Sequence, residues 1–205
     1  MRIKIAVWAL LAVVAILYWR AGRPQGVADR EPIDWSREPI QTPTEIAPFT
    51  IETRRGTVRL RPRAAYDVAA VVESRERYWA DDTAFLSPLD LALAWGEVPT
   101  AAYRSKLEMG QSWRMFWWRP KDPTVDLDYV IRHTANTHLL PAGPNLRKAL
   151  LAIERGDAIR LRGLLVDVET EGWSWTTSLS RSDHGDIGCE VLWVQSVQDG
   201  DRLYE

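Results

Sequence analysis

Residues 49–61 read FTIETRRGTVRLR, and this stretch sets the expectation for the fold of the whole chain. Apolar and polar side chains alternate on both sides of Arg55-Gly56, which predicts two strands joined by a tight turn. Val58 and Leu60 fall on the face opposite to the neighbouring arginines, as in a half-buried antiparallel hairpin. The sequence therefore predicts that the globular part opens with a β-hairpin.

The stretches that follow alternate between strand and helix patterns. Strands are predicted at residues 66–73, 112–119, 158–168, 173–179 and 189–197, with a bulge at Gly163. Helices are predicted at residues 87–95, 100–108 and 144–155, where capping residues or terminal glycines flank the pattern. Strands at both ends with helices between them predict an α+β, β-rich fold, either a small antiparallel sheet or a partly open, OB-like barrel with two or three short helices.

The chain begins MRIKIAVWALLAVVAILYWR, in which residues 5–19 carry no charge. This run predicts an N-terminal transmembrane helix within residues 1–20. It would span about 22 Å of a hydrocarbon core of about 30 Å, and Lys4 and Arg20 can reach the two interfaces. A cleaved secretory signal is the alternative, although Tyr18-Trp19-Arg20 lacks the small residues of a cleavage site. The expected location is the bacterial inner membrane, crossed once through residues 5–19, with a periplasmic globular domain.

Composition sets further limits on the chain. Residues 21–48 contain five prolines among interleaved charges and are predicted to form a linker, followed by a single β-rich domain over residues 49–205. The 26 basic residues are outnumbered by 28 acidic ones, so the basic surplus that nucleic acid requires is missing. Cys189 is the only cysteine, which excludes an intramolecular disulfide.

The densest polar stretch, residues 178–190, lies between two predicted strands. Asp183, His184 and Asp186 are candidate ligands for a divalent cation, although their spacing matches no known metal loop and turns commonly have this composition. Asp183, His184 and Cys189 are also candidate catalytic residues. Cys189 needs a histidine beside it to act as a nucleophile, and His184, His133 and His138 could each supply one. The alternative is a small core residue at the start of a strand.

A second candidate site is the aromatic stretch WRMFWWR at residues 113–119. Arg114, Trp118 and Arg119 combine cations with aromatic faces and are predicted to form a binding surface, with the other side of the strand in the core. The chain contains 11 tryptophans, which favours aromatic binding platforms or a membrane-facing rim, with bulky core residues as the alternative.

Five stretches resemble a family of uncharacterised proteobacterial membrane-anchored proteins of unknown function. The similarity covers roughly residues 55–197 and includes the segment from Asp183 to Glu190. It implies a single domain and carries no activity, cofactor or mapped site. The stretches are YDVAAVV (66–72), LSPLDLALAWG (86–96), ANTHLLPA (135–142), GDAIRLRG (156–163) and TSLSR (177–181).

Two functions remain open on these grounds. The first is a non-enzymatic, membrane-anchored domain that binds a protein partner or another envelope component, without a cofactor and without an identifiable small-molecule ligand. The second is a membrane-anchored hydrolase that uses Asp183, His184 and Cys189 together with His133 or His138. Convergence of Asp183, His184, Cys189 and either His133 or His138 within about 4 Å around a pocket would favour the second, and their scatter would exclude it.

Overall fold

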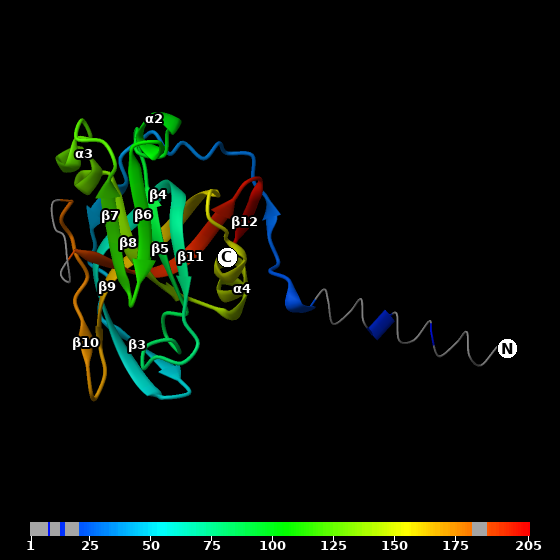
Figure 1. The fold of residues 1–205 in the computed structure, drawn as a ribbon. Coiled ribbons are helices and arrows are strands. Elements are labelled where there is room, and N and C mark those ends of the chain that lie inside the picture. Colours follow the sequence, from blue (N-terminus) through cyan, green and yellow to red (C-terminus); the bar gives the residue numbers. More distant parts are fainter. Residues whose placement is uncertain (1–7, 9–12, 15–20, 182–187) are drawn as a thin grey trace.

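The computed structural model describes residue 8, residues 13–14, residues 21–181 and residues 188–205. Within these residues the domain is β-rich and contains three short helices (Figure 1). The helices are α2 (Ala101–Arg104), α3 (Leu127–Arg132) and α4 (Pro144–Ala152). The strands are β1 (Val27–Ala28), β2 (Ile40–Pro43), β3 (Phe49–Thr53), β4 (Gly56–Arg77), β5 (Leu89–Ala94), β6 (Leu107–Ser112), β7 (Met115–Pro120), β8 (Thr134–Pro141), β9 (Ala158–Glu169), β10 (Ser174–Trp175), β11 (Cys189–Asp199) and β12 (Arg202–Tyr204).

The predicted fold class needs one correction, which concerns the N-terminal transmembrane helix. None of the helices in the described residues is long and apolar enough to cross a membrane. Of residues 5–19, where that helix was predicted, the structure describes only Trp8, Val13 and Val14. The fold class is therefore restated as a β-rich domain with short helices.

Five strands of the main sheet close into a ring. β9 pairs with both β4 and β11, so the order β4–β5–β8–β11–β9 returns to its start. Within this ring β8 and β11 run parallel, and the other four pairs are antiparallel. This is the strand order of the five-stranded OB-fold barrel, with β4, β5, β8, β9 and β11 as its first to fifth strands and α4 between the third and the fourth.

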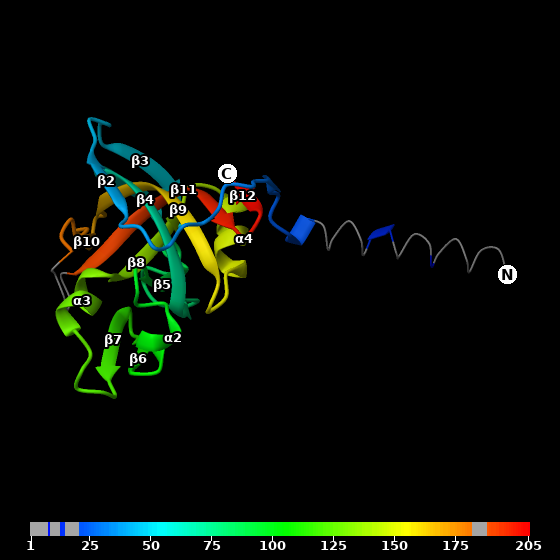
Figure 2. The same ribbon diagram turned by 90° about the horizontal axis from the view of Figure 1, so that it is seen from above.

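The long strand β4 makes the closure possible. It has 22 residues and pairs with β9 along one edge and with β3, β2 and β5 in turn along the other. The pairing register shifts between Pro62 and Ala64 and between Val72 and Ser74, and such irregularities bend a strand and increase its twist. β4 therefore curves along the barrel, so that it can pair with both of its neighbours in the ring, β9 and β5 (Figure 2).

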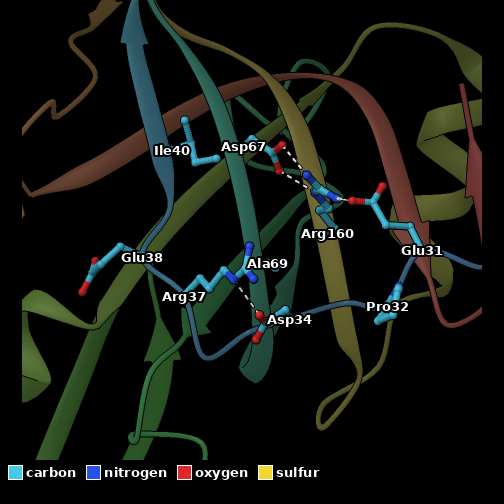
Figure 3. Close-up of a pocket in the computed structure, with 9 residues that line it drawn as sticks. All are labelled: Glu31, Pro32, Asp34, Arg37, Glu38, Ile40, Asp67, Ala69 and Arg160. Atoms are coloured by element: carbon cyan, nitrogen blue, oxygen red, sulfur yellow. Dashed lines mark hydrogen bonds and ion pairs between the residues drawn. The ribbon is translucent and has the colours of Figure 1, made fainter.

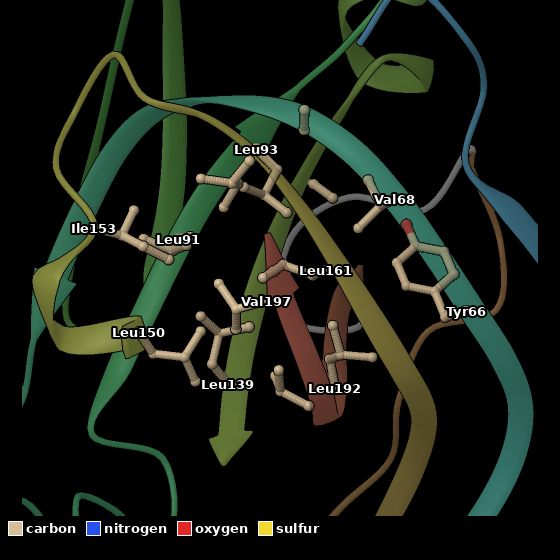
Figure 4. Packing of buried hydrophobic residues seen from close by; sticks show 14 of the residues in the cluster. Tyr66, Val68, Leu91, Leu93, Leu139, Leu150, Ile153, Leu161, Leu192 and Val197 are labelled. Carbon is tan, nitrogen blue, oxygen red and sulfur yellow. The ribbon is translucent and has the colours of Figure 1, made fainter. Parts of the chain in front are cut away.

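The barrel interior is filled by alternate residues of all five strands. Leu91, Leu139, Leu161 and Leu192 are each fully buried there, and Figure 4 shows them pointing toward one another from different strands. Full burial of such a side chain stabilises the fold by about 1.5–3 kcal/mol. α4 covers one end of the barrel through Leu150 and the residue that follows its last turn, Ile153.

A two-stranded hairpin, β6–β7, covers part of the outside of the barrel. Figure 2 shows β6 and β7 with α2 and α3 on one side of the barrel, apart from α4. Beneath the hairpin lies a separate apolar cluster that joins it to Ala94 of β5. Its buried members are Ala94, Val98, Leu107, Met109 and Val130.

Two predicted helices differ from the structure. Within residues 87–95, Leu89–Ala94 forms strand β5 in place of a helix, because it is buried on both faces, between the barrel interior and the hairpin. A short, continuous apolar run does not distinguish a buried strand from a helix. The helix predicted at residues 100–108 stops after Ala101–Arg104, and β6 begins at Leu107.

The proline-rich segment, residues 21–48, lies against the barrel at several points. Val27–Ala28 pairs with β12 and Ile40–Pro43 pairs with β4. Between these strands, Arg160 of β9 donates to Glu31 at 2.6 Å and to Asp67 at 2.7 Å, and these residues line a hollow (Figure 3). Ion pairs thus hold this segment on the barrel surface, and the Arg160 guanidinium is engaged by protein carboxylates.

Candidate functional site

The candidate site lies on the outer face of β5, β8 and β11. Asp90 of β5 is the direct cross-strand partner of His138 of β8, and Asn136 of β8 is the partner of Cys189 of β11. Side chains of paired residues share one face of a sheet, and residues two apart on a strand return to that face. Because the neighbours of Asp90 on β5 point into the barrel core, these four polar side chains lie together on the outside.

Short contacts link the four side chains across the three strands. His138 Nδ1 lies 2.8 Å from Asp90 Oδ2, at ion-pair distance. Asn136 Nδ2 donates to Cys189 Sγ at 3.2 Å. Asp90 is completely buried and His138 is 6% exposed, whereas Cys189 is half-buried. The only thiol of the chain therefore stands beside a buried imidazole that a buried carboxylate contacts.

The protonation of His138 follows from these neighbours. Burial disfavours the charged imidazole, but the Asp90 carboxylate and hydrogen bonding with Cys189 outweigh it and raise the pKa of His138 to about 9. The indole of Trp175 stacks on the imidazole ring, with the centroids 4.8 Å apart and the planes at 14°. His138 is therefore a cation at neutral pH, paired with Asp90 and shielded on one ring face.

Arg114 closes the site from the turn of the β6–β7 hairpin. Its Nη1 donates to Asp90 Oδ1 at 2.9 Å, and its Nη2 donates to both carboxylate oxygens of Asp81 at 3.0 and 2.9 Å. The guanidinium also stacks on the Tyr78 ring, 3.7 Å from its centroid. The side chain is only 15% exposed. The groups of Arg114 that were predicted to bind a ligand are thus directed at protein carboxylates.

The backbone of this turn is unusual. Trp113 and Arg114, the two residues between β6 and β7, both have positive φ, at 55° and 65°. Two-residue hairpin turns with positive φ at both positions normally use Asn and Gly, because other side chains are strained there. The strained turn places Arg114 over Asp90 and leaves Trp113 90% exposed. Strain of this kind is commonly found at functional sites.

Trp113 lines an apolar hollow of about 480 Å³ together with Trp79, which is 72% exposed. Trp79 belongs to the connection between β4 and β5, and the guanidinium of Arg77 lies 3.8 Å from the centroid of its ring. We call this hollow, with Trp79 and Trp113 on its rim, the aromatic hollow. Neither tryptophan was among the predicted binding residues, although Trp113 begins the aromatic stretch at residues 113–119 that was a candidate site.

The other predicted binding residues lie on β7, on opposite faces. Trp118 is half-buried and packs on the apolar cluster beneath the hairpin. Arg119 is exposed, 5.8 Å from the ring centroid of the neighbouring Trp117. Trp118 and Arg119 therefore do not form one surface with Arg114.

The remaining predicted site residues are distributed as follows. Asp183, His184 and Asp186 lie outside the described residues. His133 contacts Glu38 at 2.8 Å and stacks on Tyr129, separate from Cys189. Within residues 21–181 and 188–205, no group of three His, Cys, Asp or Glu side chains could hold a metal ion. Of the candidate histidines in the described chain, His138 is the one that meets Cys189.

Asp90 is the member of the site that sequence reasoning missed. It was assigned to the first turn of a predicted helix, whereas it lies in the middle of an otherwise apolar buried strand. A carboxylate is rarely buried without a partner, so its presence in that run was a signal for a charged neighbour.

Comparison with known proteins adds no further assignment. No family model, curated protein or solved structure matches this chain. The function is therefore argued from the geometry alone.

Proposed function

We propose that this domain binds a protein partner at the aromatic hollow, through a segment that presents a basic side chain next to an apolar one. The observation that carries the proposal is the exposure of two large indoles, 72% for Trp79 and 90% for Trp113, on the rim of one hollow. Large exposed apolar groups gathered in one place are typical of interaction sites, and tryptophan is enriched where binding energy concentrates.

The position of the hollow in the fold supports binding. In OB-fold barrels, ligands are bound on the face of the second and third strands and by the connection between the first and second. Here that connection runs from β4 to β5 and contains Trp79, and the β6–β7 hairpin carries Trp113 to the same place. This support is an analogy at the level of the fold.

The charges around the hollow favour a basic partner. Its lining contains the carboxylates of Glu76, Asp81 and Asp82 and the guanidinium groups of Arg77 and Arg114. Both guanidinium groups are engaged, that of Arg77 on an indole and that of Arg114 with Asp81. The side chain of Asp82 is 97% exposed and lies 3.5 Å from the Arg55 guanidinium in an exposed ion pair. A lysine or arginine of a partner would form an ion pair with this carboxylate and a cation–π contact with the face of an indole.

Binding of defined peptides tests the proposal. We expect a dye-labelled peptide of alternating Arg and Leu to bind saturably in fluorescence anisotropy, and a peptide of alternating Glu and Leu to bind much more weakly. Trp113→Ala should weaken binding of the Arg-Leu peptide by about tenfold or more, because a truncated anchor at an interface commonly loses about 1.4 kcal/mol or more.

The matched control is Ile40→Ala, which removes another exposed apolar side chain, 61% exposed, from strand β2. This variant should bind the Arg-Leu peptide as the unmodified chain does. The proposal fails if neither peptide binds saturably, if Ile40→Ala loses as much affinity as Trp113→Ala, or if a neutral oligosaccharide binds at the tryptophans while both peptides stay inert.

A further inference from the structure

We propose that Cys189 is the nucleophile of an acyl-transfer site on esters or thioesters, with His138 as its acid and base and Asp90 as the residue that positions His138. This inference goes beyond the binding function proposed above and does not depend on it. It rests on the polar cluster across β5, β8 and β11, whereas the binding proposal rests on the aromatic hollow.

The geometry has the three parts that nucleophilic catalysis requires. A nucleophile needs a base within reach, and the base needs a third group that fixes its orientation. Cys189 interacts with His138, and His138 Nδ1 lies 2.8 Å from Asp90 Oδ2. Asn136 also donates to Cys189 Sγ at 3.2 Å, which fixes the position of the sulfur. The set comes from three adjacent strands, so the barrel itself holds it rigid.

The charges that surround His138 support a reactive thiol. Asp90 faces it from β5, Cys189 from β11 and the uncharged Trp175 from β10. Arg114 from the hairpin donates to the other oxygen of Asp90 at 2.9 Å. Because the pKa of His138 is raised to about 9, the imidazole holds a proton at neutral pH. A cationic histidine next to a cysteine stabilises the thiolate, the nucleophilic form.

The residue content of the chain points to acyl transfer over other thiol chemistry. Cys189 is the only cysteine, so the chain has no second thiol to resolve a disulfide, as dithiol oxidoreductases do. A single thiol with an imidazole and a carboxylate has the constitution of an acyl-transfer nucleophile.

The reaction balances with water as the only co-reactant. The Cys189 thiolate adds to the substrate carbonyl carbon, the S–C bond forms, the bond to the leaving alcohol or thiol breaks, and His138 gives its proton to that leaving group. Neutral His138 then takes a proton from water as the water oxygen attacks the thioester. The S–C bond breaks, the carboxylic acid leaves, and thiolate and protonated imidazole are restored.

Alkylation of the intact protein by iodoacetamide across pH tests the activation of the thiol. Free cysteine has a pKa of about 8.5 and is almost unreactive at pH 6, whereas thiols paired with a histidine cation have pKa values of about 3.5–7.5. We expect Cys189 to react at pH 6 at least about tenfold faster than free cysteine, after allowance for the lower nucleophilicity of a less basic thiolate. His138→Gln should move the inflection of the alkylation rate against pH toward about 8.5. Ile40→Ala should leave the alkylation rate of Cys189 unchanged.

Acylation by p-nitrophenyl acetate tests the covalent step. Intact-mass analysis should show one acetyl group on the unmodified chain and none on Cys189→Ser. The inference is overturned if the unmodified chain shows neither an acetyl group on Cys189 nor faster release of p-nitrophenol than Cys189→Ser. It is also overturned if the inflection of its alkylation rate against pH lies near about 8.5, or if folded His138→Gln reacts as fast as the unmodified chain. If His138→Gln fails to fold, as judged by thermal melting, the alkylation rate of the unmodified chain against pH still tests whether the Cys189 thiol is activated.

Discussion

Gly163→Ala is expected to lose about 3 kcal/mol or more of unfolding free energy, a large fraction of the roughly 5–15 kcal/mol that stabilises an ordinary domain. Gly163 of β9 pairs with both Tyr66 of β4 and Val194 of β11, at the seam that closes the barrel. A Cβ at this position would lie 2.0 Å from the carbonyl oxygen of Trp193. That oxygen belongs to the backbone, so the two strands must separate to admit the methyl group.

Urea unfolding followed by tryptophan fluorescence measures the loss. The matched control is Gly172→Ala, at a position where an added Cβ meets nothing within 4 Å. We expect Gly172→Ala to stay within about 0.5 kcal/mol of the unmodified chain. Equal stability of the two alanine variants would show that β9 and β11 do not approach each other as described, and that the barrel is open at this seam.

Arg114→Ala is expected to cost about 3–5 kcal/mol, because it removes one partner of a buried ion pair. Asp90 is completely buried, and its Oδ1 accepts from Arg114 and from the Ser87 hydroxyl. Arg114 is the charged donor of the two and also pairs with Asp81. Arg114→Lys should recover only part of the loss, since an ammonium group cannot bridge two carboxylates as the planar guanidinium does.

The control for this prediction lies on the same hairpin. Arg119 is exposed on β7, and Arg119→Ala should change the unfolding free energy by no more than about 0.5 kcal/mol. Both variants are compared by urea unfolding. If Arg114→Ala is as mild as Arg119→Ala, Arg114 does not hold the hairpin on the barrel and is free to serve as a ligand-binding residue.

Elements defined by short-range patterns could be predicted from the sequence. The hairpin predicted from residues 49–61 is confirmed as β3 and the start of β4. Its turn is Arg54-Arg55, one residue before the predicted position, and Gly56, at φ +107°, is the first residue of β4. The helix after Gly143 is confirmed as α4, which begins at Pro144. In both cases a proline or glycine and a regular apolar repeat lie within a dozen residues, so neighbours along the chain determine the structure.

Elements whose environment is set by distant segments could not be predicted from the sequence. The run before Trp95 has a serine, a proline and an acid spaced as at a helix start, yet burial from both sides makes it β5. The hairpin β6–β7 that covers this strand is itself built on a turn with positive φ at Trp113 and Arg114, which their identities do not suggest. Tertiary packing outweighed local preference in both places.

The candidate site depends on long-range pairing in the same way. Asn136 and Cys189 are 53 positions apart and meet through the parallel pairing of β8 with β11. Residue types alone could suggest that Cys189 needs a histidine, but they could not distinguish His138 from His133, or identify Asp90 as the third member. Only the strand order of the closed barrel does so.

An NMR titration of the His138 imidazole tests most directly whether Asp90, His138 and Cys189 share one outer face. The signal is assigned by its loss in His138→Gln. We expect a titration midpoint of about 9, well above the ordinary value of about 6.5, and a lower midpoint in Cys189→Ser because the thiol contributes to the shift. A midpoint at or below 6.5 in the native protein would contradict this arrangement.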